Sequence, residues 1–118
     1  MMSKGIERKN AIITSASLGI EDHGILTVSL CFEYECGCQC FGGYAMDSYD
    51  KAKKRRIGTA YGMEFVIRVM ETVGVTEWSQ LKGKHVRVEA EQCKVHAIGN
   101  IVKNAWFNPE QDLKEFVE

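Results

Sequence analysis

The sequence predicts one α+β domain, in which helices cover one face of an antiparallel β-sheet. Its 118 residues, 45% of them hydrophobic, are enough for a single core. Several segments alternate apolar and polar residues, as half-buried strands do. One central segment instead repeats its apolar residues at helical spacing. Together these patterns predict the order ββ(β)αββα in a single domain over residues 1–118.

The first half of the chain predicts a three-stranded antiparallel meander. Residues 11–20 and 25–33 alternate apolar with polar side chains, and the turn between them ends at Gly24, which suits a positive φ angle. A second turn near residues 34–37 leads into a third strand over residues 38–44. The side chains that the second strand is expected to direct into the core are Leu26, Val28, Leu30 and Phe32.

A polar connection and a helix follow the meander. Residues 46–57 show no clean period, so they are expected to form a surface connection. The helix begins at Gly58-Thr59 and ends at Gly74, a residue typical of a C-terminal cap. Its apolar residues recur at helical spacing and are expected to face the sheet. The helix residues expected in the core are Met63, Val66, Ile67 and Met70.

The last part of the chain predicts a second hairpin and a terminal helix. Strands over residues 86–90 and 95–102 flank a turn at residues 91–93. Asn108 can accept hydrogen bonds from the first turn of a helix, and Pro109 fits its first position. We expect this helix to continue to the end of the chain.

Charge and hydropathy limit the classes of function. The 15 Lys and Arg nearly balance the 16 Asp and Glu, which argues against a polycation that coats nucleic acid and against an acidic disordered tail. No apolar run approaches the ~20 residues of a membrane span, and residues 1–10 are polar. We therefore expect a soluble, cytoplasmic protein without membrane contact that binds its partner locally.

The five cysteines form no recognisable metal motif. Cys36, Cys38 and Cys40 share one face of an extended strand, which spaces neighbouring sulfurs by roughly 7 Å and so argues against zinc. Cys93 and His96 would complete a site only if the two hairpins were adjacent. We expect no metal, reduced thiols rather than disulfides, and cysteines that act as small hydrophobic residues of a core-facing strand.

No residue set has the spacing of an active site. His23, His85 and His96 are candidate bases for a cysteine nucleophile by number alone. The acidic residues beside His23, Glu21 and Asp22, lie in a predicted turn, where such residues are typical for conformational reasons. We therefore expect no enzyme and no cofactor, and we keep Asp22 and His23 only as candidate ligand contacts.

A run of basic residues gives the clearest binding signal. Five of the 15 Lys and Arg lie between positions 51 and 56, just before the expected helix start. Cations beside the free N–H groups of a helix N-terminus favour an anion, although a charge run is also typical of a solvated loop. Neither glycine-rich nucleotide-binding motif is present, so no nucleotide hydrolase or dinucleotide enzyme is implied. The anion would be a phosphate of nucleic acid or of a nucleotide, or it would belong to an acidic protein partner. The candidate residues are Lys51, Lys53, Lys54, Arg55, Arg56 and Thr59.

Two adjacent glycines, Gly42 and Gly43, interrupt the predicted third strand. Glycine inside a strand indicates a bulge or the close approach of another backbone, and less commonly a ligand contact. We keep both residues as candidate ligand contacts. Core packing explains most of the aromatic content. The aromatic residues that are candidates for stacking on bases are Tyr44, Tyr49, Tyr61, Trp78, Trp106 and Phe107.

Several stretches of the chain resemble small accessory proteins encoded by tailed bacteriophages and prophages. The stretches that carry the resemblance are Leu18 to Thr27, Phe41 to Tyr44, Gly58 to Phe65, Leu81 to Val88 and Lys94 to Gly99. It spans roughly Leu18 to Leu113 and implies a phage protein in the host cytoplasm, with no catalytic residues to transfer. The stretch Leu81 to Val88 also resembles one in phage replication and recombination accessory proteins.

A small phage protein without a catalytic set is expected to act by binding. Our first hypothesis is an inhibitor of a host antiviral defence, such as CRISPR–Cas or nucleotide-signalled immunity, that docks on a host protein or sequesters a small nucleotide. The first alternative is a nucleic-acid-binding helper in phage replication, recombination or packaging that uses the basic run. Further alternatives are a zinc protein built on the cysteine-rich strand and a virion component, and a homo-oligomer stays open.

Overall fold

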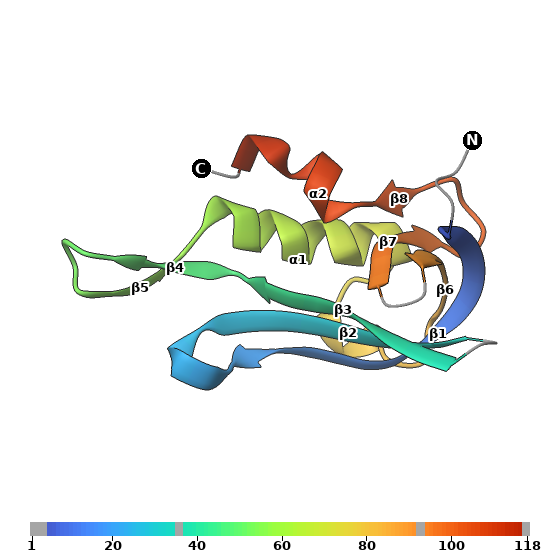
Figure 1. The fold of residues 1–118 in the computed structure, drawn as a ribbon, viewed down its shortest axis with the longest axis horizontal. Helices are drawn as coiled ribbons and strands as arrows, with labels where there is room; N and C mark the ends of the chain where they lie inside the picture. Colours follow the sequence, from blue (N-terminus) through green and yellow to red (C-terminus); the bar gives the residue numbers. More distant parts are fainter. Residues whose placement is uncertain (1–4, 35–36, 92–93, 117–118) are drawn as a thin grey trace.

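The fold is α+β, as the sequence predicts, with antiparallel strand pairs and two α-helices among the described residues (Figure 1). The computed structural model describes residues 5–34, 37–91 and 94–116. The strands are β1 (Glu7–Ile20), β2 (Leu26–Tyr34), β3 (Gly37–Ala45), β4 (Asp47–Asp50), β5 (Arg55–Gly58), β6 (His85–Glu91), β7 (Lys94–Asn100) and β8 (Trp106–Phe107). The helices are α1 (Ala60–Val73) and α2 (Pro109–Asp112), with 3₁₀ helices η1 (Asp22–Gly24), η2 (Trp78–Gln80) and η3 (Lys114–Phe116).

The main sheet has six strands in the order β3-β2-β1-β6-β7-β8. The long strand β1 joins its two halves, because its later residues pair with β2 and its earlier residues pair with β6. Ile12 pairs with both strands, and a register shift follows between Ile13 and Ser15; such a bulge lets a strand bend. Strand β3 also contacts β7, four places away in the sheet order. The sheet therefore curls around the core.

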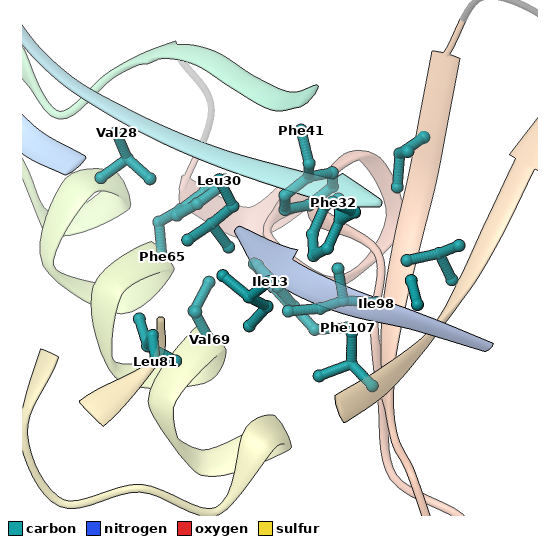
Figure 2. Packing of buried hydrophobic residues seen from close by; sticks show 14 of the residues in the cluster. Ile13, Val28, Leu30, Phe32, Phe41, Phe65, Val69, Leu81, Ile98 and Phe107 are labelled. Atoms are coloured by element: carbon teal, nitrogen blue, oxygen red, sulfur yellow. The ribbon is translucent and has the colours of Figure 1, made fainter. Parts of the chain in front are cut away.

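The core fills the concave side of the curled sheet, and α1 packs against it (Figure 2). Phe65 of α1 lies at the centre of an aromatic cluster. Its ring stacks on Phe41 of β3 at 5.8 Å between centroids and meets Phe107 of β8 edge-on at 5.2 Å. Three of the four core residues predicted for the second strand, Val28, Leu30 and Phe32, are fully buried, whereas Leu26 is half-buried.

The predicted ends of α1 are confirmed. Thr59 is the N-cap, and its Oγ1 accepts a hydrogen bond from the backbone N–H of Gly62 at 2.9 Å. Gly74 ends the helix in the left-handed conformation, with φ at 90°, and its N–H donates to the carbonyl of Met70. The terminal helix also begins as predicted, because Asn108 caps it and Pro109 opens it, but α2 lasts only four residues before η3.

The predicted core-facing stripe of α1 is wrong at Met63 and Ile67. Met63 and Ile67 are 62% and 39% exposed, whereas Phe65 and Val69 are fully buried. Both pairs are apolar at i, i+4 spacing, so the pattern alone does not choose between them. The choice is made by packing, since Phe65 completes the aromatic cluster. The other predicted core residues of this helix, Val66 and Met70, are half-buried.

The cysteine expectations also need correction. Cys31 of β2 and Cys40 of β3 face each other across the two strands and form a disulfide. The expectation of reduced thiols is therefore wrong for this pair. Cys40 and the free Cys38 are exposed, so these residues do not fill a core-facing strand. Cys36 of the predicted cysteine-rich strand and Cys93, the candidate metal ligand near His96, lie outside the described residues.

Candidate functional site

The run of basic residues lies on a β-hairpin rather than on an irregular connection. Strands β4 and β5 pair antiparallel, from Asp47 opposite Gly58 to Asp50 opposite Arg55, with a turn over residues 51–54. We call residues 47–58 the basic hairpin. In Figure 1 it extends away from the main sheet at one end of the long axis of the molecule. The expectation of a surface connection is therefore wrong in structure, although these residues do lie at the surface.

The tip of the basic hairpin carries four exposed cations, Lys51, Lys53, Lys54 and Arg55. Within residues 5–34, 37–91 and 94–116, none of the four forms an ion pair with a carboxylate. Arg55 donates only a hydrogen bond from Nε to the backbone carbonyl of Arg56, at 3.2 Å. The turn itself is stabilised by Asp50, whose Oδ1 accepts a hydrogen bond from the N–H of Lys53 at 2.9 Å. The tip therefore presents positive charge that the protein does not use internally.

The fifth basic residue, Arg56, is not a free cation, because it forms an ion pair with Asp47 at the base of the hairpin. Its Nη2 donates to Oδ1 of Asp47 at 2.9 Å and to the carbonyl of Asp47 at 3.2 Å. The other carboxylate oxygen of Asp47 accepts from the N–H of Leu26 on β2, at 3.3 Å. The hydrogen bond from Arg56 lowers the pKa of the Asp47 carboxyl below its ordinary value. Arg56 therefore holds the hairpin on the sheet and is not free to bind an anion.

Thr59, the other candidate beside the run, also has an internal role. Besides capping α1, its hydroxyl donates to the carbonyl of Met46 at 3.1 Å. The small residue Gly62 is explained by packing as well, because a Cβ at this position would overlap the backbone of Met46. The sequence around the helix start therefore reflects close packing on the segment before β4, rather than a cradle for phosphate.

A groove lies where the basic hairpin joins the body. Its volume is ≈ 610 Å³, and its walls come from β4, β5, the first turn of α1 and η3. The residues that matter for its chemistry are Ser48, Ile57, Tyr61 and Phe116. The Tyr61 ring also packs 6.3 Å from Phe65, and burial raises the pKa of its phenol. The groove is therefore lined largely by apolar and aromatic groups next to a cationic tip.

One exposed aromatic ring stands on the basic hairpin itself. Tyr49 of β4 lies directly opposite Arg56 and is 56% exposed. Exposed aromatic rings beside cations are the groups on which unpaired bases stack.

The remaining candidate contacts have conformational explanations. Asp22 and His23 belong to η1, where His23 is exposed and has a positive φ of 63°, followed by Gly24 at 75°. In β3, a Cβ on Gly42 would lie 2.6 Å from the Cα of Ser29, at the register shift between β2 and β3. This is the close backbone approach that the sequence predicts. Gly43 continues the same strand.

The histidines and cysteines do not assemble a metal site within the described part of the chain. No group of three or more metal-ligating side chains occurs there. The Nε2 atom of His96 lies 2.7 Å from Oε1 of Glu91, and the side chain of His85 is exposed on β6. Cys93, which the sequence pairs with His96, lies outside the described residues.

Comparison with known proteins gives no relative to guide the interpretation. No family model matches the chain, and neither the curated proteins nor the solved structures contain a match. Among the described residues, no helix is long and apolar enough to cross a membrane. The function must therefore be argued from the basic hairpin and the groove at its base.

Proposed function

We propose that this protein binds nucleic acid through the basic hairpin, whose tip cations contact phosphates. One observation carries the proposal: Lys51, Lys53, Lys54 and Arg55 are exposed on a projecting hairpin and form no ion pair with a described carboxylate. Phosphate contacts from Lys and Arg supply most of the affinity of non-specific nucleic-acid binding. The protein as a whole is not cationic, because its net charge is −1. Electrostatic attraction of the phosphates would therefore be confined to this hairpin.

The order of the strands supports the same proposal. A long, bent β1 is shared between the β1-β2-β3 meander and the β6-β7 hairpin, α1 lies between the two in sequence, and β3 contacts β7. We assign this arrangement to the OB-fold, a partly open five-stranded barrel that often binds oligonucleotides or oligosaccharides. Fold analogy alone does not assign a function. The evidence for nucleic-acid binding therefore comes from the exposed cations of the basic hairpin, and the fold is consistent with it.

This proposal corresponds to the first alternative from the sequence, a nucleic-acid-binding helper. Inhibition of a host antiviral defence stays a prediction, as does the phage origin on which it rests. Docking on a host protein would also use exposed charge, so the exposed cations alone do not separate a protein partner from a phosphate backbone. The dependence of binding on salt distinguishes them, because phosphate contacts release counterions and rim charges of a protein interface do so more weakly.

The proposal is tested with a matched pair of triple variants. In the first, Lys51, Lys53 and Lys54 are replaced by Glu. In the control, the exposed lysines Lys82, Lys84 and Lys103 are replaced by Glu, which makes the same change in net charge away from the hairpin and the groove. Binding to labelled oligonucleotides at low salt should fall at least about tenfold more in the first variant than in the control. Equal losses, or no binding by the unmodified protein, would contradict the proposal.

A further inference from the structure

Resting on this proposed function, we infer that the ligand is single-stranded nucleic acid and that one unstacked base enters the groove at the base of the basic hairpin. The groove has a volume of ≈ 610 Å³. Sites for small organic molecules typically measure about 300 to 1,000 Å³, so a base with its sugar is of suitable size. The groove therefore holds the base, while the cations of the hairpin tip contact the phosphates.

The chemistry of the groove suits a base better than a phosphate. Ile57, Tyr61 and Phe116 provide apolar and aromatic surface from three different elements. The hydroxyl of Ser48 also lines the groove and has no hydrogen-bond partner among the described residues. A flat base can pack against such rings while a hydroxyl satisfies one of its polar edge atoms.

The charges around the groove are complementary to a polynucleotide. The carboxylate of Asp47 at the groove is neutralised by the guanidinium of Arg56, so it does not oppose an approaching phosphate. Ile57 in the groove is three residues from Lys54 at the tip, a distance of about 10 Å along a strand. A chain with a base in the groove can therefore run along the hairpin and place neighbouring phosphates beside the tip cations.

A duplex is a poor match for this arrangement. Its bases are paired and stacked, and a base must leave the stack before it can enter a pocket. The exposed ring of Tyr49 offers a second stacking surface on the same hairpin, which again requires an unpaired base. The combination of one groove, one exposed ring and a cationic tip therefore selects single strands.

The test compares a single-stranded oligonucleotide with a duplex of equal length. The unmodified full chain should bind the single strand at least about tenfold more tightly. Ala60 lines the groove and is exposed, so Ala60→Trp fills the groove without removing a core side chain. We expect this variant to lose about tenfold in affinity for the single strand and little for the duplex. Met63→Trp is the control, since Met63 is exposed on the same helix but does not line the groove.

Further variants test the groove and the exposed ring separately. If Ala60→Trp does not fold, Ser48→Trp fills the groove from its opposite wall, and Tyr49→Ala against Tyr49→Phe tests the exposed ring. Equal affinity for single strand and duplex, or full single-strand affinity in a folded groove-filling variant, would overturn the inference. Loss of affinity in the triple lysine variant without any effect of filling the groove would leave the proposed function intact and remove only the groove. Absence of binding to either oligonucleotide would instead refute the proposed function.

Discussion

Arg56 anchors the basic hairpin through Asp47, with 2.9 Å between Nη2 and Oδ1. Only 8% of the Asp47 side chain is exposed, and its second carboxylate oxygen accepts the N–H of Leu26. One carboxylate thus connects β5 to β4 and both to β2. The position of the tip cations therefore depends on an ion pair at the base of the hairpin.

The first prediction concerns this carboxylate. Asp47→Asn removes the charge that Arg56 contacts, so the hairpin should open more often and trypsin should cut it faster after its lysines and arginines. Glu115→Gln, an exposed change outside the hairpin, is the control and should leave the cleavage rate unchanged. Cleavage at the same rate in both variants would show that the ion pair does not hold the hairpin.

Acidification should have the same effect as Asp47→Asn. The folded-state pKa of Asp47 is lowered, so its contribution to stability is present above the ordinary value of about 3.9 and is lost as the pH falls through the folded-state pKa. Trypsin is inactive there, so amide hydrogen exchange of residues 47–58 is the measurement. The rate of amide exchange, corrected for its intrinsic pH dependence, should rise in the unmodified protein as the pH falls through the folded-state pKa of Asp47. It should not rise in Asp47→Asn.

The second prediction separates two adjacent arginines. Arg55→Glu should weaken nucleic-acid binding and leave the melting temperature nearly unchanged, because Arg55 is exposed and makes no ion pair. Arg56→Glu places two carboxylates together at the hairpin base and should lower the melting temperature or the protection of the hairpin. The sequence alone predicts that both changes leave the fold intact. Thermal unfolding of the two variants decides between these expectations.

The third prediction concerns the orientation of α1. Val69→Asp buries a charge without a partner and should cost several kcal/mol, whereas Ile67→Asp should cost much less because Ile67 is 39% exposed. Likewise Phe65→Ala should lower the free energy of unfolding by about 3 to 5 kcal/mol. Urea unfolding provides the values. A larger loss in Ile67→Asp than in Val69→Asp would restore the orientation predicted from the sequence.

The fourth prediction concerns the disulfide between Cys31 and Cys40. It closes a short loop, and the chain-entropy model gives such a loop about 2 to 3 kcal/mol. Cys31→Ser should therefore destabilise the oxidised protein by up to this amount, and Cys38→Ser should not. Adding a reductant should remove the difference between the two variants. Peptide mapping without reductant should recover the segments around residues 31 and 40 as one linked species; separate segments would contradict the pairing.

The sequence predicts much of this fold because its signals are local. Alternation identifies the main strands, and Thr59 and Gly74 identify both ends of α1. The orientation of α1 escapes prediction because Met63 and Phe65 both begin apolar i, i+4 pairs and only tertiary packing distinguishes them. The pairing of Cys31 with Cys40 depends in turn on the register of two strands. Spacing within the row of cysteines carries no information about that register.

The basic hairpin escapes prediction for a different reason. It projects from the core, so its strands have no buried face and show no apolar period. A signal was nevertheless present: Asp47 and Asp50 precede the turn and Arg55 and Arg56 follow it, which places opposite charges across an antiparallel pair. The groove could not be read from the sequence, because Ile57 and Phe116 meet only through the tertiary fold.

The salt dependence of oligonucleotide binding tests the central claim most directly. For the unmodified protein, the logarithm of the binding constant should fall linearly with the logarithm of salt concentration, with a slope of about −0.7 for each single-strand phosphate neutralised. Replacing Lys51, Lys53 and Lys54 by Glu should make this slope less steep by about 2, while the control at Lys82, Lys84 and Lys103 keeps it. Identical slopes for the hairpin variant and the unmodified protein would contradict the account, because the tip cations would then not contact phosphate.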